Sequence, residues 1–175
     1  RTNFLKSFGK AEYVPYGFQA IITGGYTWSQ FMNKPYIGLK LSILNHFKDV
    51  GYINAKLDIG SHFSTKFTQG ALNTKISFLT NTFKHNRYRY RIMSFVNYTT
   101  GINRFTNDMI YLGEDYGFIG MNDKVFYGQE RLFAELYGIS YTPWYMFGFR
   151  FAVFAFCSGG YLGDEKLPLM RNQFL

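Results

Sequence analysis

A strict alternation of apolar and polar residues recurs along this chain and is the feature that most constrains its fold. In residues 37–43 the aliphatic side chains occupy one set of alternate positions and Lys40 lies in the other. Residues 52–59 repeat the pattern, with Lys56 and Asp58 on the polar side. Because successive side chains of a β-strand point to opposite faces, both segments are predicted to be strands with one apolar and one polar face.

Five further segments share this character. The stretch RYRYRIMSFVNY, residues 87–98, opposes three arginines to Tyr88, Tyr90 and Ile92. The other strands are expected at 16–26, at 72–80 with Lys75 on the polar side, at 131–139, and from Met146 onward, where Arg150 interrupts an apolar run. We therefore expect about seven strands, no helix, and an all-β antiparallel fold.

Two kinds of β fold are compatible with such strands. A soluble sandwich or lipocalin-like barrel buries its apolar face and shows its polar face to water. A transmembrane β-barrel inverts this arrangement, with apolar side chains toward lipid, a polar lumen, and aromatic girdles at both interfaces. The alternation alone does not separate them, since the arginines of 87–98 also suit the solvated face of a soluble protein.

Aromatic residues favour the membrane barrel. They make up 21% of the chain, and Tyr or Phe stands near both ends of several strands. Examples are Tyr36 with Phe47, Tyr52 with Phe63, and Tyr88 with Tyr98. Such rings match the two headgroup layers of a bilayer. The fold predicted is thus a transmembrane barrel, of which this chain supplies about seven strands.

The polar side of these strands predicts a basic lumen. A net charge of +8 would raise nucleic acid as a partner, but the basic residues are dispersed singly, so we expect no nucleic-acid binding. The lumen would favour anionic solutes or an acidic polypeptide segment. Its expected lining is Lys40, Lys56, Asp58, Lys75, Arg87, Arg89, Arg91 and Arg150.

Other features limit the chemistry and the extent of the chain. The single Cys157 reads as a small apolar residue, and neither a metal-ligand spacing nor a catalytic motif is present, so we expect no cofactor, no metal and no enzymatic activity. With neither an initiating Met nor a signal peptide, the 175 residues are expected to be part of a longer, processed protein. They form one partial barrel domain, 1–175, with a long loop at about 102–127.

The last third of the chain adds a resemblance. Its segments read GINRF, GEDYGFIGMND, YGQERLFAELYGISYTPW and GFRFAVFAFCSGGYLG in that order. They resemble the surface-antigen barrels of the Bam/Tam assembly-factor and two-partner-secretion superfamily, most of all its Bacteroidetes relatives, and the chain is similar to a C-terminal part of such a barrel.

In that family the long loop folds into the lumen, and its arginine meets acidic groups on the adjoining strands. The resemblance places the loop motif on Gly117, Phe118, Ile119, Gly120 and Met121. It places the strand positions that contact the loop on Arg131, Glu135, Tyr137, Phe156, Ser158 and Gly160. The family arginine is Ile119 here and the family aspartate is Ser158, so both charges of that contact are replaced together.

The resemblance implies a non-enzymatic protein of the bacterial outer membrane that takes part in inserting or translocating polypeptides. Its partners would be the lipid bilayer, client polypeptides and periplasmic accessory proteins. The departures in the loop contact keep a second function open, a porin-like pore or a passive barrel that anchors a fused periplasmic domain. A soluble β-barrel that binds an apolar ligand is the third.

Overall fold

Seven long antiparallel strands dominate the structure, a computed structural model that describes residues 2–3, 11–12, 16–28, 33–64, 66–105, 108–112, 126–163 and 173–174. The long strands are β3 (Gly17–Trp28), β4 (Asn33–Phe47), β5 (Gly51–Phe63), β6 (Phe67–Thr80), β8 (Tyr88–Ile102), β11 (Glu130–Met146) and β12 (Phe149–Gly163). The short strands are β1 (Thr2–Asn3), β2 (Ala11–Glu12), β7 (Phe83–His85), β9 (Ile110–Leu112), β10 (Phe126–Gly128) and β13 (Gln173–Phe174). The predicted all-β antiparallel fold is confirmed.

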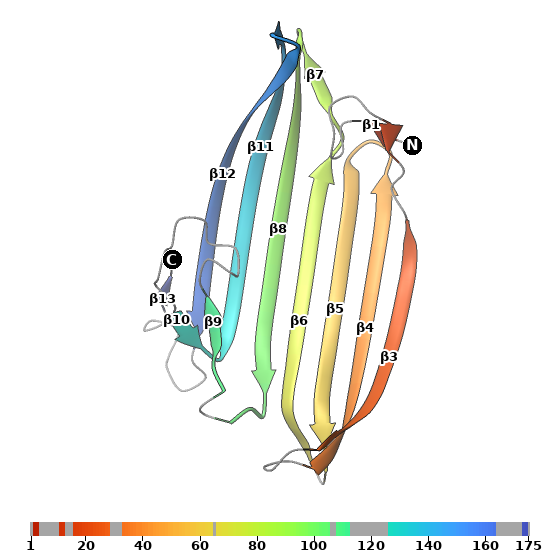
Figure 1. Cartoon of the computed structure of the whole chain (residues 1–175), viewed down its shortest axis with the longest axis vertical. Coiled ribbons are helices and arrows are strands. Elements are labelled where there is room, and N and C mark those ends of the chain that lie inside the picture. Colours follow the sequence, from red (N-terminus) through yellow and green to blue (C-terminus); the bar gives the residue numbers. More distant parts are fainter. Residues whose placement is uncertain are drawn as a thin grey trace.

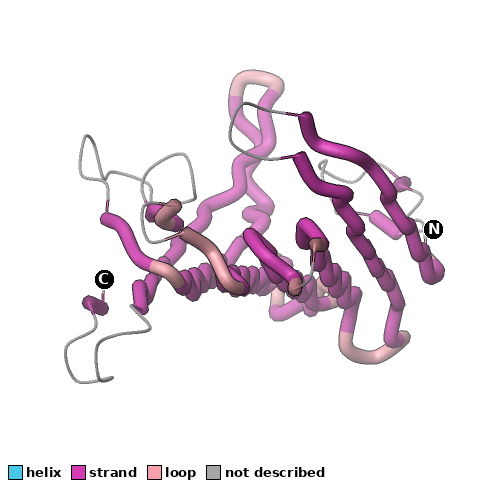
Figure 2. The backbone as a smooth tube through the Cα atoms, turned by 90° about the horizontal axis from the view of Figure 1, so that it is seen from below, coloured by secondary structure: helices cyan, strands magenta, loops and turns pink. Residues whose placement is uncertain are grey.

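The long strands form one sheet in the order β13-β12-β11-β8-β6-β5-β4-β3, and β7 pairs with β8 (Figure 1). Neighbours along the chain are neighbours in the sheet, apart from the segment between β8 and β11, whose strands β9 and β10 pair with each other. Viewed roughly along the strands, the sheet is bent and does not close on itself (Figure 2). The described part of the chain contains no helix long and apolar enough to span a bilayer.

The strand register sorts the side chains onto two faces, because residues directly opposite each other in a ladder point to the same side. One row of opposed residues runs Lys40, Asp58, Asn73, Thr99, Arg131 across five strands. A row on the other side runs Ile43, Ala55, Ile76, Val96, Ala134. We call these sides the polar face and the apolar face, and the predicted alternation in each strand is what separates them.

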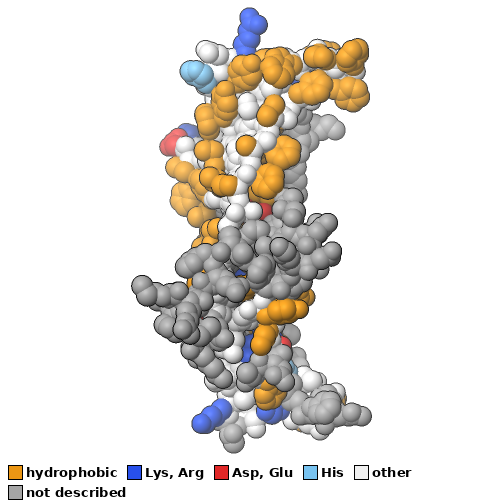
Figure 3. All heavy atoms as spheres, turned by 90° about the vertical axis from the view of Figure 1, so that its left-hand side faces the viewer, with side chains coloured by type: hydrophobic (Ala, Val, Ile, Leu, Met, Phe, Trp, Pro, Cys, Tyr) orange, Lys and Arg blue, Asp and Glu red, His pale blue; other side chains and the backbone are white. Residues whose placement is uncertain are grey.

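The aliphatic side chains of the apolar face are exposed, whereas several side chains of the polar face are buried. Arg91 and Phe133 are each only 2% exposed, and Asn97 and Arg131 are also buried. Figure 3, seen from the β12 edge, shows hydrophobic side chains gathered toward the end of the sheet with the β11–β12 turn. The exposed side chains of the apolar face include Ile22, Ile37, Leu39, Ile43, Ile59, Ile76, Ile92, Val96, Leu132, Leu136, Phe151 and Val153.

Three expectations need correction. The segment from Met146 is not one strand, because Phe147 and Gly148 both have positive φ, 52° and 83°, and form the turn between β11 and β12. Arg87 lies in the turn before β8 and is not in the strand. Arg91 lies on the polar face as predicted, but it is buried and therefore not a water-exposed lumen side chain.

The pairs of terminal aromatic residues are also only partly as predicted. Phe47, Tyr88 and Tyr98 lie on the apolar face by register, but Tyr36 and Tyr52 occupy even positions of their strands and lie on the polar face. There the Tyr52 ring stacks on His46 with ring centroids 4.2 Å apart. The Tyr36 ring lies over Gly38 and Gly60, whose missing side chains leave the space that it fills. These two tyrosines therefore pack inside the sheet's polar side and do not form a girdle.

The turn at residues 48–50 depends on the glycine that follows it. Gly51 has φ of +143°, and a Cβ at this position would collide with the carbonyl oxygen of Leu79 and lie 2.8 Å from the Cα of Thr80. Val50 N donates to the Phe47 carbonyl at 3.1 Å, and Asn81 N donates to the Val50 carbonyl at 3.0 Å. Backbone atoms of β4 and β6 therefore fix the path of the chain at Gly51.

We expect the substitution Gly51→Ala to lower the free energy of unfolding by more than about 1 kcal/mol, because both the backbone conformation and the contact with β6 exclude a side chain. Urea unfolding followed by tryptophan fluorescence measures this change. The matched control is Gly138→Ala, since a Cβ at Gly138 meets nothing within 4 Å. Equal unfolding midpoints for the two variants would contradict the role assigned to Gly51.

Candidate functional site

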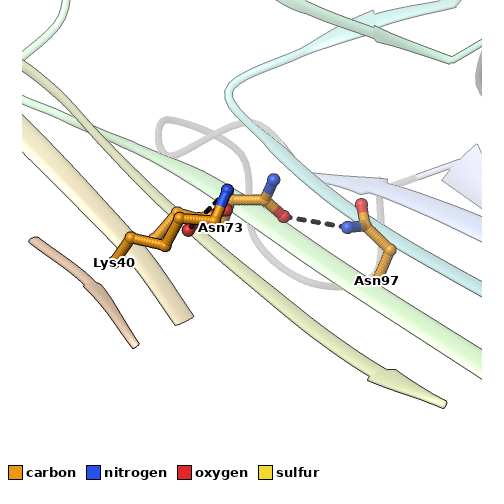
Figure 4. Close-up of polar contacts among 4 residues, drawn as sticks. Lys40, Asn73 and Asn97 are labelled. Atoms are coloured by element: carbon orange, nitrogen blue, oxygen red, sulfur yellow. Dashed lines mark hydrogen bonds and ion pairs between the residues drawn. The ribbon is translucent and has the colours of Figure 1, made fainter. Parts of the chain in front are cut away.

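A row of polar side chains crosses the middle of the polar face from β4 to β11. Lys40 and Asp58 form an ion pair of 3.7 Å. Asn97 Nδ2 donates to Asn73 Oδ1 at 2.8 Å, and Figure 4 shows Lys40, Asn73 and Asn97 succeeding one another across the strands. Thr99 lies beside them and donates to Asn97 Oδ1 at 3.2 Å. The row places cationic, anionic and amide groups on one surface at one level of the sheet.

Arg131 is the buried end of this row. Its Nη2 donates to Asn97 Oδ1 at 3.1 Å and to Thr99 Oγ1 at 3.2 Å. Its Nη1 donates at 3.0 Å to the backbone carbonyl of Tyr111, a residue of β9. One guanidinium thus joins β11, β8 and the segment between them. A planar group with five donors is well suited to join three partners in this way.

The segment that follows β8 is fixed at its base as well as at Arg131. Gly101 N donates to the Gln129 carbonyl at 3.2 Å, and Gln129 N donates to the Gly163 carbonyl at 2.9 Å. β9 lies beside β11, and β10 beside β12. Phe133, packed with Leu162 and Phe95, forms the small apolar core of this region. The described parts of the segment therefore lie against the β8–β11–β12 end of the polar face.

The strand positions singled out in the sequence share one face of two neighbouring strands. In the ladder, Glu135 is opposite Ser158 and Tyr137 is opposite Phe156, with their rings stacked at 5.7 Å between centroids. Gly160 is opposite the buried Phe133. The Tyr137 hydroxyl donates to Glu135 Oε1 at 3.1 Å, whereas Arg131 on the same strand bonds to other partners. The loop motif Gly117 to Met121 lies outside the described residues.

The structure also shows on which face each residue of the expected lumen lining lies. Lys40, Lys56, Asp58, Lys75, Arg89, Arg91 and Arg150 all lie on the polar face by register. Only Arg87 lies outside the strands. Together with Arg89 and Arg150 it lines a hollow of about 280 Å³ near the β11–β12 turn. The basic residues are therefore divided between the middle of the sheet and one end of it.

A second hollow, of about 510 Å³, gives the polar face an apolar region. Leu44, Leu79, Met93 and Phe95 line it, and the Glu135–Tyr137 pair lies at its border. The sequence did not predict this region or the roles of Asn97, Thr99 and Phe133. The contacts of an amide or an aromatic ring on the polar face cannot be predicted until the strand register is known. Since Asn73 and Asn97 stand on different strands, their pairing follows only from the register.

Within the described ranges, no three His, Cys, Asp or Glu side chains gather as a metal ion would require. Comparison with protein-family models, with curated proteins and with solved structures finds no match for this chain. The polar face therefore has to be interpreted from its own residues.

We expect the substitution Arg131→Gln to release β9 from the sheet. It removes a charged donor from the Tyr111 carbonyl and leaves buried acceptors on β8, at about 1–3 kcal/mol for each group that stays without a partner. Hydrogen exchange at Ile110, Tyr111 and Leu112 should accelerate. The control is Lys56→Gln, which removes an exposed charge from the same face. Unchanged amide exchange at these three residues in Arg131→Gln would contradict the role of Arg131 in holding β9 against the sheet.

Proposed function

We propose that the chain forms part of the wall of a transmembrane β-barrel, with the apolar face toward lipid and the polar face toward the lumen. The observation that carries this proposal is the apolar face itself. It extends over seven strands, its aliphatic side chains are exposed, and within the described residues no second layer of structure covers it. A hydrocarbon environment makes such a face stable, whereas water makes it a site of aggregation.

The role proposed for this barrel is non-enzymatic, the insertion or translocation of polypeptides at the outer membrane. Two features support it. The segment after β8 lies against the polar face at Arg131, as an inward-folded loop would, and the order of motifs in the last third resembles the surface-antigen barrels. The remaining strands of a closed barrel would then belong to the full-length protein, since seven strands fall below the smallest bacterial barrels.

The contact between loop and strand has the opposite polarity from that of the family it resembles. There the loop supplies an arginine and the strands supply the acid. In this chain β11 supplies Arg131, and a loop backbone carbonyl accepts. A carbonyl acceptor does not depend on the side chain at that position of the loop, so the contact tolerates sequence change in β9. This explains how an inward segment is compatible with Ile119 and Ser158 in place of the two family charges.

A pore or a passive anchor is the second candidate function. It is favoured by the basic residues of the polar face, which would line a water-filled passage for anions. Channel recordings of the full-length protein in planar bilayers separate the two functions. Steady anion-selective conductance in the wild type supports a pore. A closed wild type that opens in Arg131→Gln supports a barrel closed by its inward segment.

Two adjacent residues of β12 test which face meets lipid. Cys157, the only cysteine of the chain, is exposed on the apolar face, and Ser158 lies on the polar face. A nitroxide at Cys157 should collide with oxygen dissolved in the bilayer and be shielded from a water-soluble nickel complex. A nitroxide at Ser158→Cys, in a Cys157→Ser background, should show the reverse preference.

The reconstituted full-length protein is the material for this experiment, and a heat-dependent shift in gel mobility serves as the control that the barrel is folded. A soluble β-barrel would also shield Cys157 from the nickel complex, because its apolar face would enclose a ligand, but oxygen dissolved in the bilayer would not relax the label and the protein would be recovered in aqueous extracts. Preferential quenching of the Cys157 label by the nickel complex, or recovery of the protein in aqueous extracts, would refute the membrane orientation.

A further inference from the structure

A hollow of about 360 Å³ lies on the polar face at strands β3 to β6. This volume falls within the range of about 300–1,000 Å³ that small-molecule sites occupy. The described lining includes no residue of β11 and none of the segment between β8 and β11, so the hollow is separate from the contact of Arg131 with Tyr111. The hollow combines one aromatic ring, one charge of each sign and two amides. Its larger polar residues are Tyr36, Lys40, Asp58, Gln69 and Asn73.

The Tyr36 ring forms a fixed platform at this hollow. It lies over Gly38 and Gly60, where a Cβ at Gly60 would collide with the tyrosine hydroxyl and one at Gly38 would lie 2.9 Å from it. The ring of His62 packs against it with centroids 5.2 Å apart, and His62 Nε2 is 3.0 Å from Thr27 Oγ1. The Tyr36 side chain is only partly buried, so some of the ring surface remains accessible from the hollow. A ring held in this way offers a flat surface to the C–H groups of a ligand.

The hydrogen bonds of Asn73 determine which end of its amide meets the hollow. An arginine side chain only donates, so Asn97 Oδ1 is the atom that accepts from Arg131 Nη2 at 3.1 Å. The other end of the Asn97 amide, Nδ2, then donates to Asn73 Oδ1 at 2.8 Å (Figure 4). Thr99 Oγ1 lies 3.5 Å from the same oxygen. The Nδ2 donors of Asn73 are therefore left for a ligand, since no described residue accepts from them.

Lys40 and Asp58 supply the charged groups of the hollow. Their 3.7 Å separation is longer than a hydrogen bond, so both groups keep the capacity to bond to a ligand. The side chains are 51% and 36% exposed, and both are thus within reach from the hollow. Asp58 Oδ1 is buried, so Oδ2 is the oxygen that a ligand can reach. The described lining carries no net charge, which favours a neutral ligand over an anion or a cation.

We propose that this hollow binds a neutral saccharide, with the C–H face of a sugar ring against Tyr36 and its hydroxyls bonded to Lys40, Asp58 and Asn73. A sugar hydroxyl both donates and accepts, so neighbouring hydroxyls can satisfy the carboxylate as well as the ammonium and amide donors. An anion would be repelled by Asp58, and a zwitterion would have to separate the Lys40–Asp58 pair. The inference goes beyond the proposed function and does not depend on it. The polar face meets water both in the lumen of a membrane barrel and on the outside of a soluble one.

Saturation-transfer NMR on the purified full-length protein tests this site, with maltose, cellobiose and lactose as probes in a detergent without a sugar headgroup. We expect saturation of the C–H protons on one face of a sugar ring. Asn73→Asp should weaken the apparent affinity about tenfold or more, because it replaces the accessible donor by an acceptor. It keeps an oxygen for the bond from Asn97, so the unfolding midpoint in urea should change little.

Asn97→Asp tests the orientation of the Asn73 amide, although Asn97 is not in the described lining of the hollow. A carboxylate cannot donate to Asn73, so the Asn73 amide has to turn its oxygen toward the hollow and the affinity should fall as in Asn73→Asp. The matched control is Asn54→Asp, which adds the same charge to the polar face of β5 outside the described lining and should keep the affinity. Tyr36→Phe retains the ring and should keep the saturation pattern, whereas Tyr36→Leu should abolish it.

Absence of saturation transfer to all three saccharides would overturn the proposal, as would equal affinities of Asn73→Asp and Asn54→Asp. Binding of free glycine, a zwitterion, in place of the saccharides would assign the Lys40–Asp58 pair to charged ligands and overturn the saccharide assignment. The nitroxide at Cys157 reports independently on the orientation of the sheet. If that label meets lipid while no saccharide binds, the barrel is supported and only this site fails.

Discussion

The strand register, which is continuous through the middle of the sheet, is the constraint on which the rest of this structure depends. Across four ladders the opposed residues keep their parity, so a side chain on the polar face of β4 predicts the side of its partner four strands away. A slip of one residue in any ladder would exchange the two faces from that strand onward. The shifts that do occur, between Gly60 and His62 and between Tyr141 and Tyr145, lie near strand ends. The faces are therefore preserved where the sheet is longest.

This constraint explains what could be predicted from the sequence. The position of each strand and the sorting of Lys40, Asp58 and Lys75 onto one face follow from alternation alone, because they are properties of single segments. The burial of Arg91 and the bond from Arg131 to Tyr111 depend on residues distant in the chain, and no local pattern encodes them. The run from Met146 was misjudged because a Phe-Gly turn lacks the polar residues that usually mark a hairpin.

Burial of a charged residue on the polar face has a further physical meaning. A guanidinium removed from water needs partners for its donors, and Arg131 bonds to three partners through Nη1 and Nη2. The bond to the Tyr111 carbonyl also joins β11 to β9, two strands that no ladder connects. The burial of the Arg131 guanidinium, its hydrogen bonds and the position of β9 are thus coupled. A change in any one of them alters the others.

The end of the sheet at β3 specifies what can lie beyond it. In the described structure β3 is the last strand of the order, and its outer backbone groups point along the sheet plane. A strand that pairs there has to place apolar side chains beside Phe18 and Ile22 and polar ones beside Gln19. Opposite Gly24 and Gly25, around which a Cβ would meet nothing within 4 Å, it can carry its largest rings. The two faces of β3 therefore constrain the sequence of any strand that pairs with it.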